Sequence, residues 1–415
     1  MPSVMAGDVG GTNSRFMLYE VSGRQHMHQG KRAPGKLIHC QSYPNENVSS
    51  FCVQVETFLK DAGCTEPPMA ACFAIAGPVS NNKVVMTNRN WVVDGSEVSG
   101  AGFNIGEVRL INDFVAAGYG LLTLDIEVEC VTVQSGVHQK GAPIACIGSG
   151  TGLGETFLTC PVRDLHSVPR DNNASGVDAH LWYDAWPTEG GHAELAPRND
   201  LEYEFIQYMK KVKGVSRVSV ERLVSGSGLA NLYDFLSEKF PERVDQATHA
   251  AYLAAGDMRG KVIAEAASTP GSICNQVMEI WATHYGSEAG VAGLKHLPLG
   301  GIFLAGGMTP KNIHLIQGTD SPFIKAFYDK GRVSSALRNV PIYAVMEENI
   351  GQRGAHYVAF SMYENTVAKE MAVAKQRDTD RATARFVFAM AASAIAGALV
   401  ALTAVRVVGA GAGKR

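Results

Sequence analysis

Apolar runs separated by glycine-rich turns form the most regular pattern along this chain. Residues 4–6 and 16–19 are apolar and flank the sequence DVGGT at 8–12, which predicts a strand, a tight turn and a second strand. The pattern returns where the apolar run 144–147 enters GSGTGLG at 148–154, after which strand character resumes. The chain therefore contains two strand–glycine turn–strand units that are far apart in sequence.

Other apolar periodicities predict the remaining elements. The expected elements are an amphipathic helix within 45–64, strands at 70–76, 107–111 and 299–305, a helix at 114–122, an irregular excursion at 161–188, a mostly helical region at 200–300 and a charged, alanine-rich helix or spacer at 365–385. Strands and helices that alternate in this way indicate two α/β domains with a cleft between them.

The glycine turns are candidate phosphate sites, because a turn without Cβ atoms lets backbone N–H groups approach an anion. Ordinary hairpins are the alternative. Neither turn has the Gly-Lys-Ser/Thr of a Walker A motif, and a strand rather than a helix follows each. Two such turns suggest two half-domains that face one nucleotide. Asp8 is placed to support a divalent cation through water, and Gly306-Gly307 could let a nucleoside lie against bare backbone.

Composition narrows the class of protein. The chain has 415 residues, of which 46% are hydrophobic and 19% charged, enough apolar material for two or three domains with substantial cores. A net charge of −3 makes nucleic acid an unexpected partner. The eight cysteines include no Cys-x-x-Cys pair, which is typical of reduced thiols inside the cell. We expect no signal peptide before the first strand.

The C-terminal end differs from the rest of the chain. Residues 386–405 contain no charge, and four basic residues against no acid lie within 385–415. Twenty uncharged residues match the length of a membrane-spanning helix, so a tail anchor is expected here, although eight of them are alanine. An alanine-rich tail helix without a membrane role is the alternative.

Asn112 and Asp113 stand where a predicted strand ends and a helix begins, the place where α/β sheets position their chemistry. If the glycine turns hold a nucleotide, Asp113 could accept a proton from a hydroxyl group and direct it at a γ-phosphate. A helix N-cap is the alternative role for this aspartate.

The segment TEGGHAE at 188–194 brings Glu189 and His192 together among glycines, as a sugar site would need for paired hydrogen bonds. A metal site is disfavoured because no cysteine lies between Cys160 and Cys274, and a surface turn is the plain alternative. Glu221 begins a helical run, where it could simply complement the helix dipole.

Taken together, these residues resemble the bacterial-type glucokinase family of the actin-like, hexokinase-fold ATPases, from about residue 4 to about residue 364. The motifs that carry the resemblance are DVGGTNSRF (8–16), IAGPV (75–79), MTNRNW (86–91), INDF (111–114), GSGTGLG (148–154), EGGHAELAP (189–197), ERLVSGSGL (221–229) and GIFLAGG (301–307). The chain is less similar to the ROK sugar kinases, whose zinc-binding cysteine cluster it lacks. Residues 365–415 have no counterpart in the family pattern.

The resemblance implies an α/β, two-domain actin-like (ribonuclease H-like) sugar kinase fold, with a small domain at 1–115 completed by about 346–364 and a large domain at 116–345. It implies ATP-dependent phosphorylation of D-glucose to glucose 6-phosphate, the first step of glycolysis, with Mg²⁺. By resemblance Asp113 is the catalytic base, and the sugar is bound by Asn112, Asp113, Glu189, His192 and Glu221. ATP would be held by Asp8, Gly10, Gly11, Thr12, Asn13, Gly148, Gly150, Thr151, Gly152, Gly306 and Gly307, with Asp8 also supporting Mg²⁺ through water.

Two alternatives stay open at the level of sequence. One is a membrane-tethered sugar sensor without catalysis, since actin-like folds can bind a sugar and close without chemistry. The other is a kinase of another hexose. We expect a cytoplasmic catalytic body, with 386–405 as the candidate organelle anchor, and the sequence leaves a homodimer open.

Overall fold

Two mixed β-sheets organise the protein, as seen in a computed structural model that describes residues 1–411 except 24, 26, 87–90, 101, 103 and 161–182. The first sheet comprises β1 (Ser3–Val9), β2 (Asn13–Glu20), β3 (Lys36–Pro44), β4 (Ala70–Ile75) and β7 (Glu107–Asn112) in the order β3-β2-β1-β4-β7. The second comprises β8 (Cys130–Gln134), β9 (Ile144–Ser149), β10 (Leu153–Thr159), β11 (Asp184–Pro187), β12 (Ile302–Ala305) and β13 (Ile342–Val345) in the order β11-β10-β9-β12-β13-β8. A small hairpin pairs β5 (Lys83–Val85) with β6 (Val92–Asp94).

The two sheets repeat one pattern of strand directions. In the first, β1 pairs antiparallel with β2 and parallel with β4, and β4 runs parallel to β7. In the second, β9 pairs antiparallel with β10 and parallel with β12, and β12 runs parallel to β13. The glycine turns join β1 to β2 and β9 to β10, so they occupy equivalent places in the two sheets. Both predicted strand–turn–strand units are thereby confirmed.

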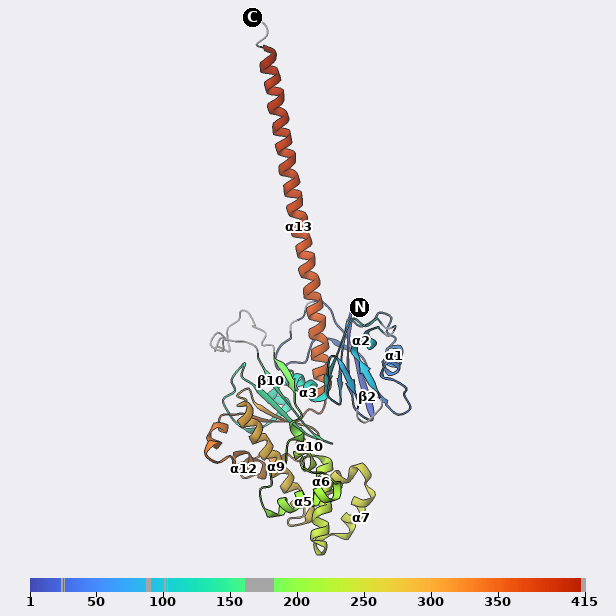
Figure 1. Ribbon diagram of the computed structural model, residues 1–415, viewed down its shortest axis with the longest axis vertical. Helices are drawn as coiled ribbons and strands as arrows, with labels where there is room; N and C mark the ends of the chain where they lie inside the picture. The colour runs from blue at the N-terminus through green and yellow to red at the C-terminus, as the bar shows by residue number, and fades with distance from the viewer. Residues whose placement is uncertain are drawn as a thin grey trace. The chain divides into compact units, whose positions relative to one another are not determined.

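Helices pack on these sheets. Those that follow the first strands are α1 (Phe51–Asp61), α2 (Gly95–Gly100), α3 (Asp113–Leu121) and α4 (Ile126–Glu129). Later helices are α5 (Asp200–Lys213), α6 (Gly226–Lys239), α7 (Gln246–Ala254), α8 (Arg259–Ala266), α9 (Ile273–His296), α10 (Met308–Lys311), α11 (Ile313–Ile316), α12 (Pro322–Tyr328) and α13 (Ile350–Gly411). Figure 1 shows α1 and α2 beside the first sheet and α9 beside the second. The predicted helical region 200–300 is confirmed.

Each sheet has its own hydrophobic core. Phe16, Phe58 and Phe73 pack together between the first sheet and α1, with ring centroids 5.5 to 5.9 Å apart. The largest buried cluster includes Trp281 and Tyr285 of α9 against the second sheet. Burial of aromatic side chains of this size contributes about 2 to 3 kcal/mol each, so both sheets are firmly held.

Two predicted boundaries differ from the structure for local reasons. The helix expected within 45–64 begins at Phe51, because Ser50 is extended and its hydroxyl accepts a hydrogen bond from the N–H of Val53. The excursion expected at 161–188 ends in a strand, since β11 pairs antiparallel with β10. The rest of that excursion, 161–182, lies outside the described residues.

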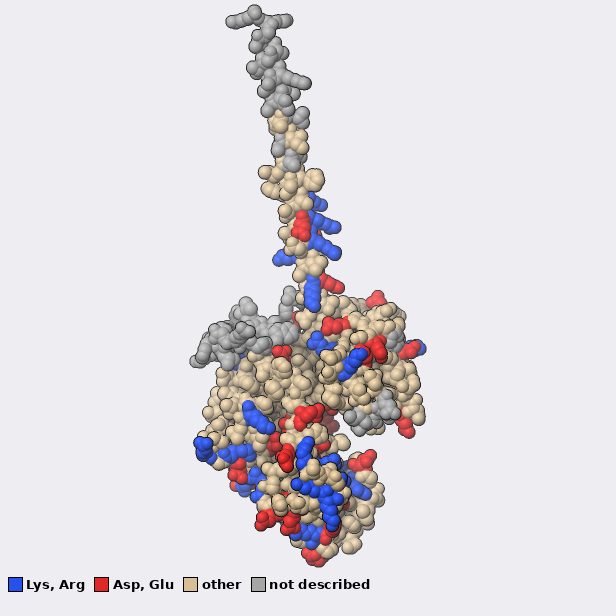
Figure 2. Space-filling view, viewed as in Figure 1, with Lys and Arg blue, Asp and Glu red and all other residues tan. Residues whose placement is uncertain are grey.

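The last helix continues well beyond the sheets in sequence. By contacts the chain divides into two units, Met1–Ser22 with His26–Phe360, and Gly23–Gln25 with Ser361–Arg415. The charged side chains of α13 gather on one stretch in Figure 2, and all residues from 369 to 390 are exposed. The predicted domain boundaries near 115 and 345 stay predictions.

In the part of the chain that the structure describes, no helix is long and apolar enough to cross a membrane. The expected membrane anchor at 386–405, and with it the membrane as a partner, is therefore not supported. The stretch is helical as predicted. Eight of its twenty residues are alanine, whose transfer into lipid gains little free energy.

Candidate active site

Asp113 lies at the carboxyl end of β7, where the strand turns into α3. Asn112 caps this helix: its Oδ1 accepts hydrogen bonds from the N–H groups of Phe114 and Val115. The capping role considered for Asp113 thus belongs mainly to Asn112, although Asp113 Oδ1 also accepts from the N–H of Phe114 at 2.9 Å. Asn112 Nδ2 donates to the carbonyl of Gly77 at the end of the neighbouring strand.

The electrostatic surroundings of Asp113 suit a base. Burial, together with the carboxylates of Asp8 and Glu189, raises the pKa of Asp113 to about 6, although the Phe114 N–H opposes the rise. A carboxylate with this pKa is a stronger proton acceptor than an exposed one and is still ionised at neutral pH. Asp8, Asp113 and Glu189 come from three distant segments and are close enough to influence one another.

Asn45 holds the first glycine turn by hydrogen bonds. The turn closes with a hydrogen bond from the Gly10 N–H to the carbonyl of Asn13. Asn45, which is fully buried, donates through Nδ2 to the Gly10 carbonyl and through its backbone N–H to the Thr12 carbonyl, at 2.7 and 2.8 Å. Its Oδ1 accepts from the hydroxyl of Ser14. These bonds occupy the carbonyl oxygens and fix the turn.

Asp8 is the last residue but one of β1, close to this turn. Burial raises its pKa, while a hydrogen bond from the Gln352 side chain and the charge of Arg15 lower it. Among the described residues no cluster of three metal-binding side chains exists. A single carboxylate beside a glycine turn nevertheless fits Mg²⁺, which keeps most of its waters and can take other ligands from a bound nucleotide.

The second glycine turn is tied to Asp113 through the next residue, Phe114. Gly148 and Gly154 are cross-strand partners in the β9–β10 hairpin, and the Phe114 ring lies against both. A Cβ atom at Gly148 would stand 2.7 Å from Phe114 Cζ, and one at Gly154 would overlap the ring. Absent side chains at these two positions therefore let the start of α3 dock on the hairpin.

The tip of the second turn contacts the start of α6. The Gly150 N–H donates to the Gly152 carbonyl, and the Gly150 carbonyl accepts from the N–H of Gly226. Thr151 at the tip is exposed. These hydrogen bonds fix the turn, while its tip at Thr151 stays accessible to a ligand.

Gly306 and Gly307 follow β12 and precede α10, as predicted. Gly306 has φ +82° and packs directly on the backbone of Ser149, so a side chain there is excluded for two reasons. The Ser149 hydroxyl accepts from Trp281 Nε1 at 3.2 Å. Bare backbone at Gly306-Gly307 thus adjoins the base of the second glycine turn.

Glu189 and His192 lie on an exposed turn that carries a short 3₁₀ helix, η1 (Gly190–His192). Their side chains are 66% and 55% exposed, and His192 Nε2 is 3.8 Å from Glu189 Oε2. Gly191 packs on the backbone of Leu153 in β10. The turn is therefore mounted on the same strand as the second glycine turn.

Glu221 belongs to the short 3₁₀ helix η2 (Val220–Arg222), and its carboxylate faces the second glycine turn. Oε2 accepts a hydrogen bond from the Leu153 N–H at 3.0 Å, and a Cβ atom at Gly152 would lie 2.6 Å from it. In this structure Glu221 braces the hairpin, a role that its place in the sequence did not suggest.

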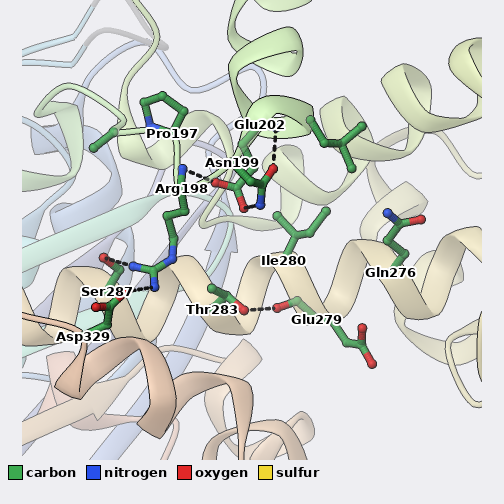
Figure 3. Close-up of a pocket in the computed structure, with 12 residues that line it drawn as sticks. Pro197, Arg198, Asn199, Glu202, Gln276, Glu279, Ile280, Thr283, Ser287 and Asp329 are labelled. Carbon is green, nitrogen blue, oxygen red and sulfur yellow. Dashed lines mark hydrogen bonds and ion pairs between the residues drawn. The ribbon is translucent and has the colours of Figure 1, made fainter.

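A cavity of about 630 Å³ lies apart from these groups. It is lined by residues 196–199, 201 and 202 and by α9 residues including Gln276, Glu279, Thr283 and Ser287, and none of the predicted site residues borders it. Figure 3 shows Arg198 reaching Ser287 and Asp329, with an Arg198–Asp329 distance of 2.7 Å. The chemistry of the predicted site resides in the glycine turns and Asp113, so this cavity is a separate feature.

Sequence reasoning missed three supporting residues. Asn45 lies in an irregular stretch without periodicity, and Phe114 read as one more apolar helix residue. Glu155, half-buried beneath the Glu189–His192 turn, read as a strand residue.

Comparison with known proteins gives a consistent result. Residues 5–362 match the profile of the Glucokinase family. A glucokinase of Nostoc sp. is 36% identical over 367 residues, covering 86% of this chain and 98% of that protein.

Solved structures agree. The crystal structure of a glucokinase from an Antarctic psychrotroph superposes with a TM-score of 0.65 at 25% identity, covering 87% of this chain and 99% of that one. A ROK family glucokinase from Streptomyces griseus in complex with glucose and AMPPNP shares the fold, with a TM-score of 0.55 at 17% identity, covering 86% of this chain and 99% of that one. Because the family profile matches most of the chain and a relative is 36% identical over 86% of it, the chain belongs to the glucokinase family.

Proposed function

We propose that this protein transfers the γ-phosphoryl group of ATP to the 6-hydroxyl of D-glucose, giving glucose 6-phosphate and ADP. The observation that carries the proposal is the environment of Asp113, a carboxyl group with a pKa of about 6 influenced by Asp8 and Glu189. Its neighbour Phe114 is seated on the second glycine turn. The family match and the activity named for its curated relatives support the same assignment.

In the proposed mechanism Asp113 accepts the proton of the sugar hydroxyl as that oxygen attacks the γ-phosphorus. Phosphoryl transfer proceeds through a loose transition state, so positioning and charge stabilisation supply most of the rate. Backbone N–H groups of the two glycine turns would hold the phosphates, with Gly10 to Asn13 on one side and Gly148 to Gly152 on the other. Gly306 and Gly307 would border the adenosine.

Mg²⁺, held near Asp8 through water, would neutralise charge on the phosphate oxygens. This chain's own contribution is to fix the Asp8 carboxylate, which Gln352 does by a side-chain hydrogen bond.

For the sugar, we propose Asn112, Asp113, Glu189, His192 and Glu221 as the binding set. Asn112 Nδ2 uses one hydrogen on Gly77, which leaves the other for a sugar oxygen. The exposed Glu189 and His192 side chains are free to turn toward a ligand. Glu221 would contact the sugar with the oxygen that does not bind Leu153.

We also propose that the predicted lobes, 1–115 with 346–364 and 116–345, close around the sugar before transfer. Closure would exclude water, which would otherwise compete with the 6-hydroxyl as the acceptor.

A coupled assay with the purified full-length chain tests the function. Glucose, other hexoses and amino sugars are each offered with ATP and Mg²⁺, and then glucose is offered with a panel of nucleotides. Turnover highest with glucose and ATP supports the proposal. Faster turnover of another hexose would reassign the substrate, and glucose binding without turnover would favour a sugar sensor.

A further inference from the structure

Glu155 is a buried carboxyl group next to the turn that carries Glu189 and His192, and the proposed chemistry leaves it unused. It lies on β10, opposite Ile147 of β9. Its Oε1 is buried and makes no hydrogen bond within the described part of the chain. Such an unsatisfied group costs stability, so its retention here calls for a role.

The side chain of Glu155 packs directly beneath Gly190. A Cβ atom at Gly190 would overlap Glu155 Oε2, so the turn can rest on this carboxyl group only because residue 190 has no side chain. Gly190 is the first residue of η1 and lies between Glu189 and the rest of the turn. The position of Glu155 Oε2 therefore limits how closely the turn that carries Glu189 and His192 can approach the sheet.

The backbone of Glu155 holds the same turn by hydrogen bonds. The Thr188 hydroxyl donates to the Glu155 carbonyl at 3.1 Å and accepts from the Gly190 N–H at 3.3 Å. The side chain of Glu155 thus contacts Gly190, and its main-chain carbonyl binds Thr188, so Glu155 contacts the turn on both sides of Glu189. The turn has further supports, since Gly191 packs on Leu153 and Arg217 donates a hydrogen bond to the His192 carbonyl.

We propose that Glu155 is a positioning residue for the sugar: its carboxyl group, packed under Gly190, holds the turn that presents Glu189 and His192. The inference rests on the proposed function of that turn. The carboxyl group itself does not touch the sugar, so its effect appears in sugar affinity rather than in phosphoryl transfer.

The charges around Glu155 favour its uncharged form. Burial, followed by the Glu288 carboxylate of α9, raises the pKa of Glu155 to about 7, although Lys295 lowers it. The titratable groups that face it or the turn above it are Cys146, Glu189, His192, Tyr285, Glu288 and Lys295. Ionisation of Glu155 as the pH rises through about 7 would place a charge where burial and Glu288 disfavour it, so we expect the support of the turn to weaken at higher pH.

Two substitutions at this position test the proposal in the full-length protein. Glu155→Ala removes the support and is expected to raise the KM for glucose about fivefold with kcat changed less than about twofold. Glu155→Gln keeps shape without charge, so its KM should match that of the wild type near pH 6 and fall below it near pH 8.5. Glu242→Gln, at an exposed position, controls for loss of one acidic group.

A double-mutant cycle locates the contact. Gly190→Ala needs no unusual backbone angle, because Gly190 does not have a positive φ, but its Cβ collides with Glu155. Combining it with Glu155→Ala removes the collision, so the KM of the double variant should lie well below the product of the two single effects.

An unchanged KM in Glu155→Ala overturns the proposal, as does a KM difference between the wild type and Glu155→Gln that is constant with pH. Because the two proteins differ only at this carboxyl group, a KM difference that changes with pH isolates Glu155. If Glu155→Ala does not fold, the Glu155→Gln comparison decides alone. If the wild type phosphorylates no sugar, the proposed function is wrong rather than the role of Glu155. In that case glucose titration followed by tryptophan fluorescence still tests Glu155.

Discussion

Asp113 owes its properties to burial rather than to its residue type. An exposed aspartate has a pKa near 3.8, whereas burial and two neighbouring carboxylates bring this one to about 6. Keeping this carboxylate ionised at neutral pH, in a buried place that disfavours charge, lowers the stability of the folded protein. Such a loss of stability is common at groups that serve activity. Two predictions follow from this single side chain.

Replacing Asp113 by Asn removes the proton acceptor while its shape is kept. We expect kcat to fall by on the order of 10²-fold or more, with glucose still bound. Steady-state kinetics and a glucose titration measure the two effects. The melting temperature at pH 8 should not fall, because the variant loses a buried charge. Near-normal turnover would remove Asp113 from the role of base.

The pH dependence of kcat follows from the same group. Only the ionised form accepts a proton, and that form is present above the pKa, so kcat at saturating substrates should be lost as the pH falls through about 6. A profile between pH 4.5 and 8, with circular dichroism at each pH to confirm folding, measures this. A plateau that extends to pH 4.5 would contradict a raised pKa at the catalytic group.

At the scale of elements, the start of α3 and the β9–β10 hairpin form one unit. Asp113 directs its carboxyl group at the site while Phe114, the next residue, rests on Gly148 and Gly154. The proposed base and the second glycine turn are therefore linked through adjacent residues of one chain segment. Displacement of the Phe114 ring should therefore change the distance between the Asp113 carboxylate and the second glycine turn.

Gly154→Ala tests this coupling, since its Cβ would overlap the Phe114 ring. We expect kcat/KM to fall by about tenfold to a hundredfold, because small displacements of reacting groups are costly. Gly100→Ala is the control, because its Cβ meets no atom within 4 Å and the position is exposed. Equal activity of the two variants would show that Phe114 does not position Asp113.

At the scale of the whole molecule, the proposed site lies within the first of the two units. That unit ends at Phe360, and every residue assigned to substrate precedes Pro310 in the chain. The exposed part of α13 makes no contribution to either sheet core. We therefore expect its removal to leave catalysis intact.

A chain that ends at residue 364 should keep kcat and the KM for glucose and ATP within about twofold of the full-length values, since truncation of an exposed terminal segment removes little burial. The coupled assay on both proteins, each checked by thermal melting, gives the comparison. A tenfold loss of activity in a folded truncated protein would assign the helix a catalytic role.

The sequence by itself determined the glycine turns with their flanking strands, the strands that end near 75, 112 and 305, the helical region 200–300, and the positions of Asn112, Asp113 and Glu189. These depend on local properties, namely apolar periodicity, helix caps and residues without Cβ atoms. For residues 386–405, the sequence pattern predicted the helix correctly. Their length suggested a membrane span, but no helix among the described residues is long and apolar enough to form one.

Only the tertiary structure decided how these parts act together. The raised pKa of Asp113, the Asn45 brace, the contact of Glu221 with Leu153 and the support of Gly190 by Glu155 each join residues separated by dozens of positions. Such contacts arise when strands from distant segments are brought to one edge of a sheet. Burial and neighbouring charge, which set the chemistry of a side chain, exist only after that packing has formed.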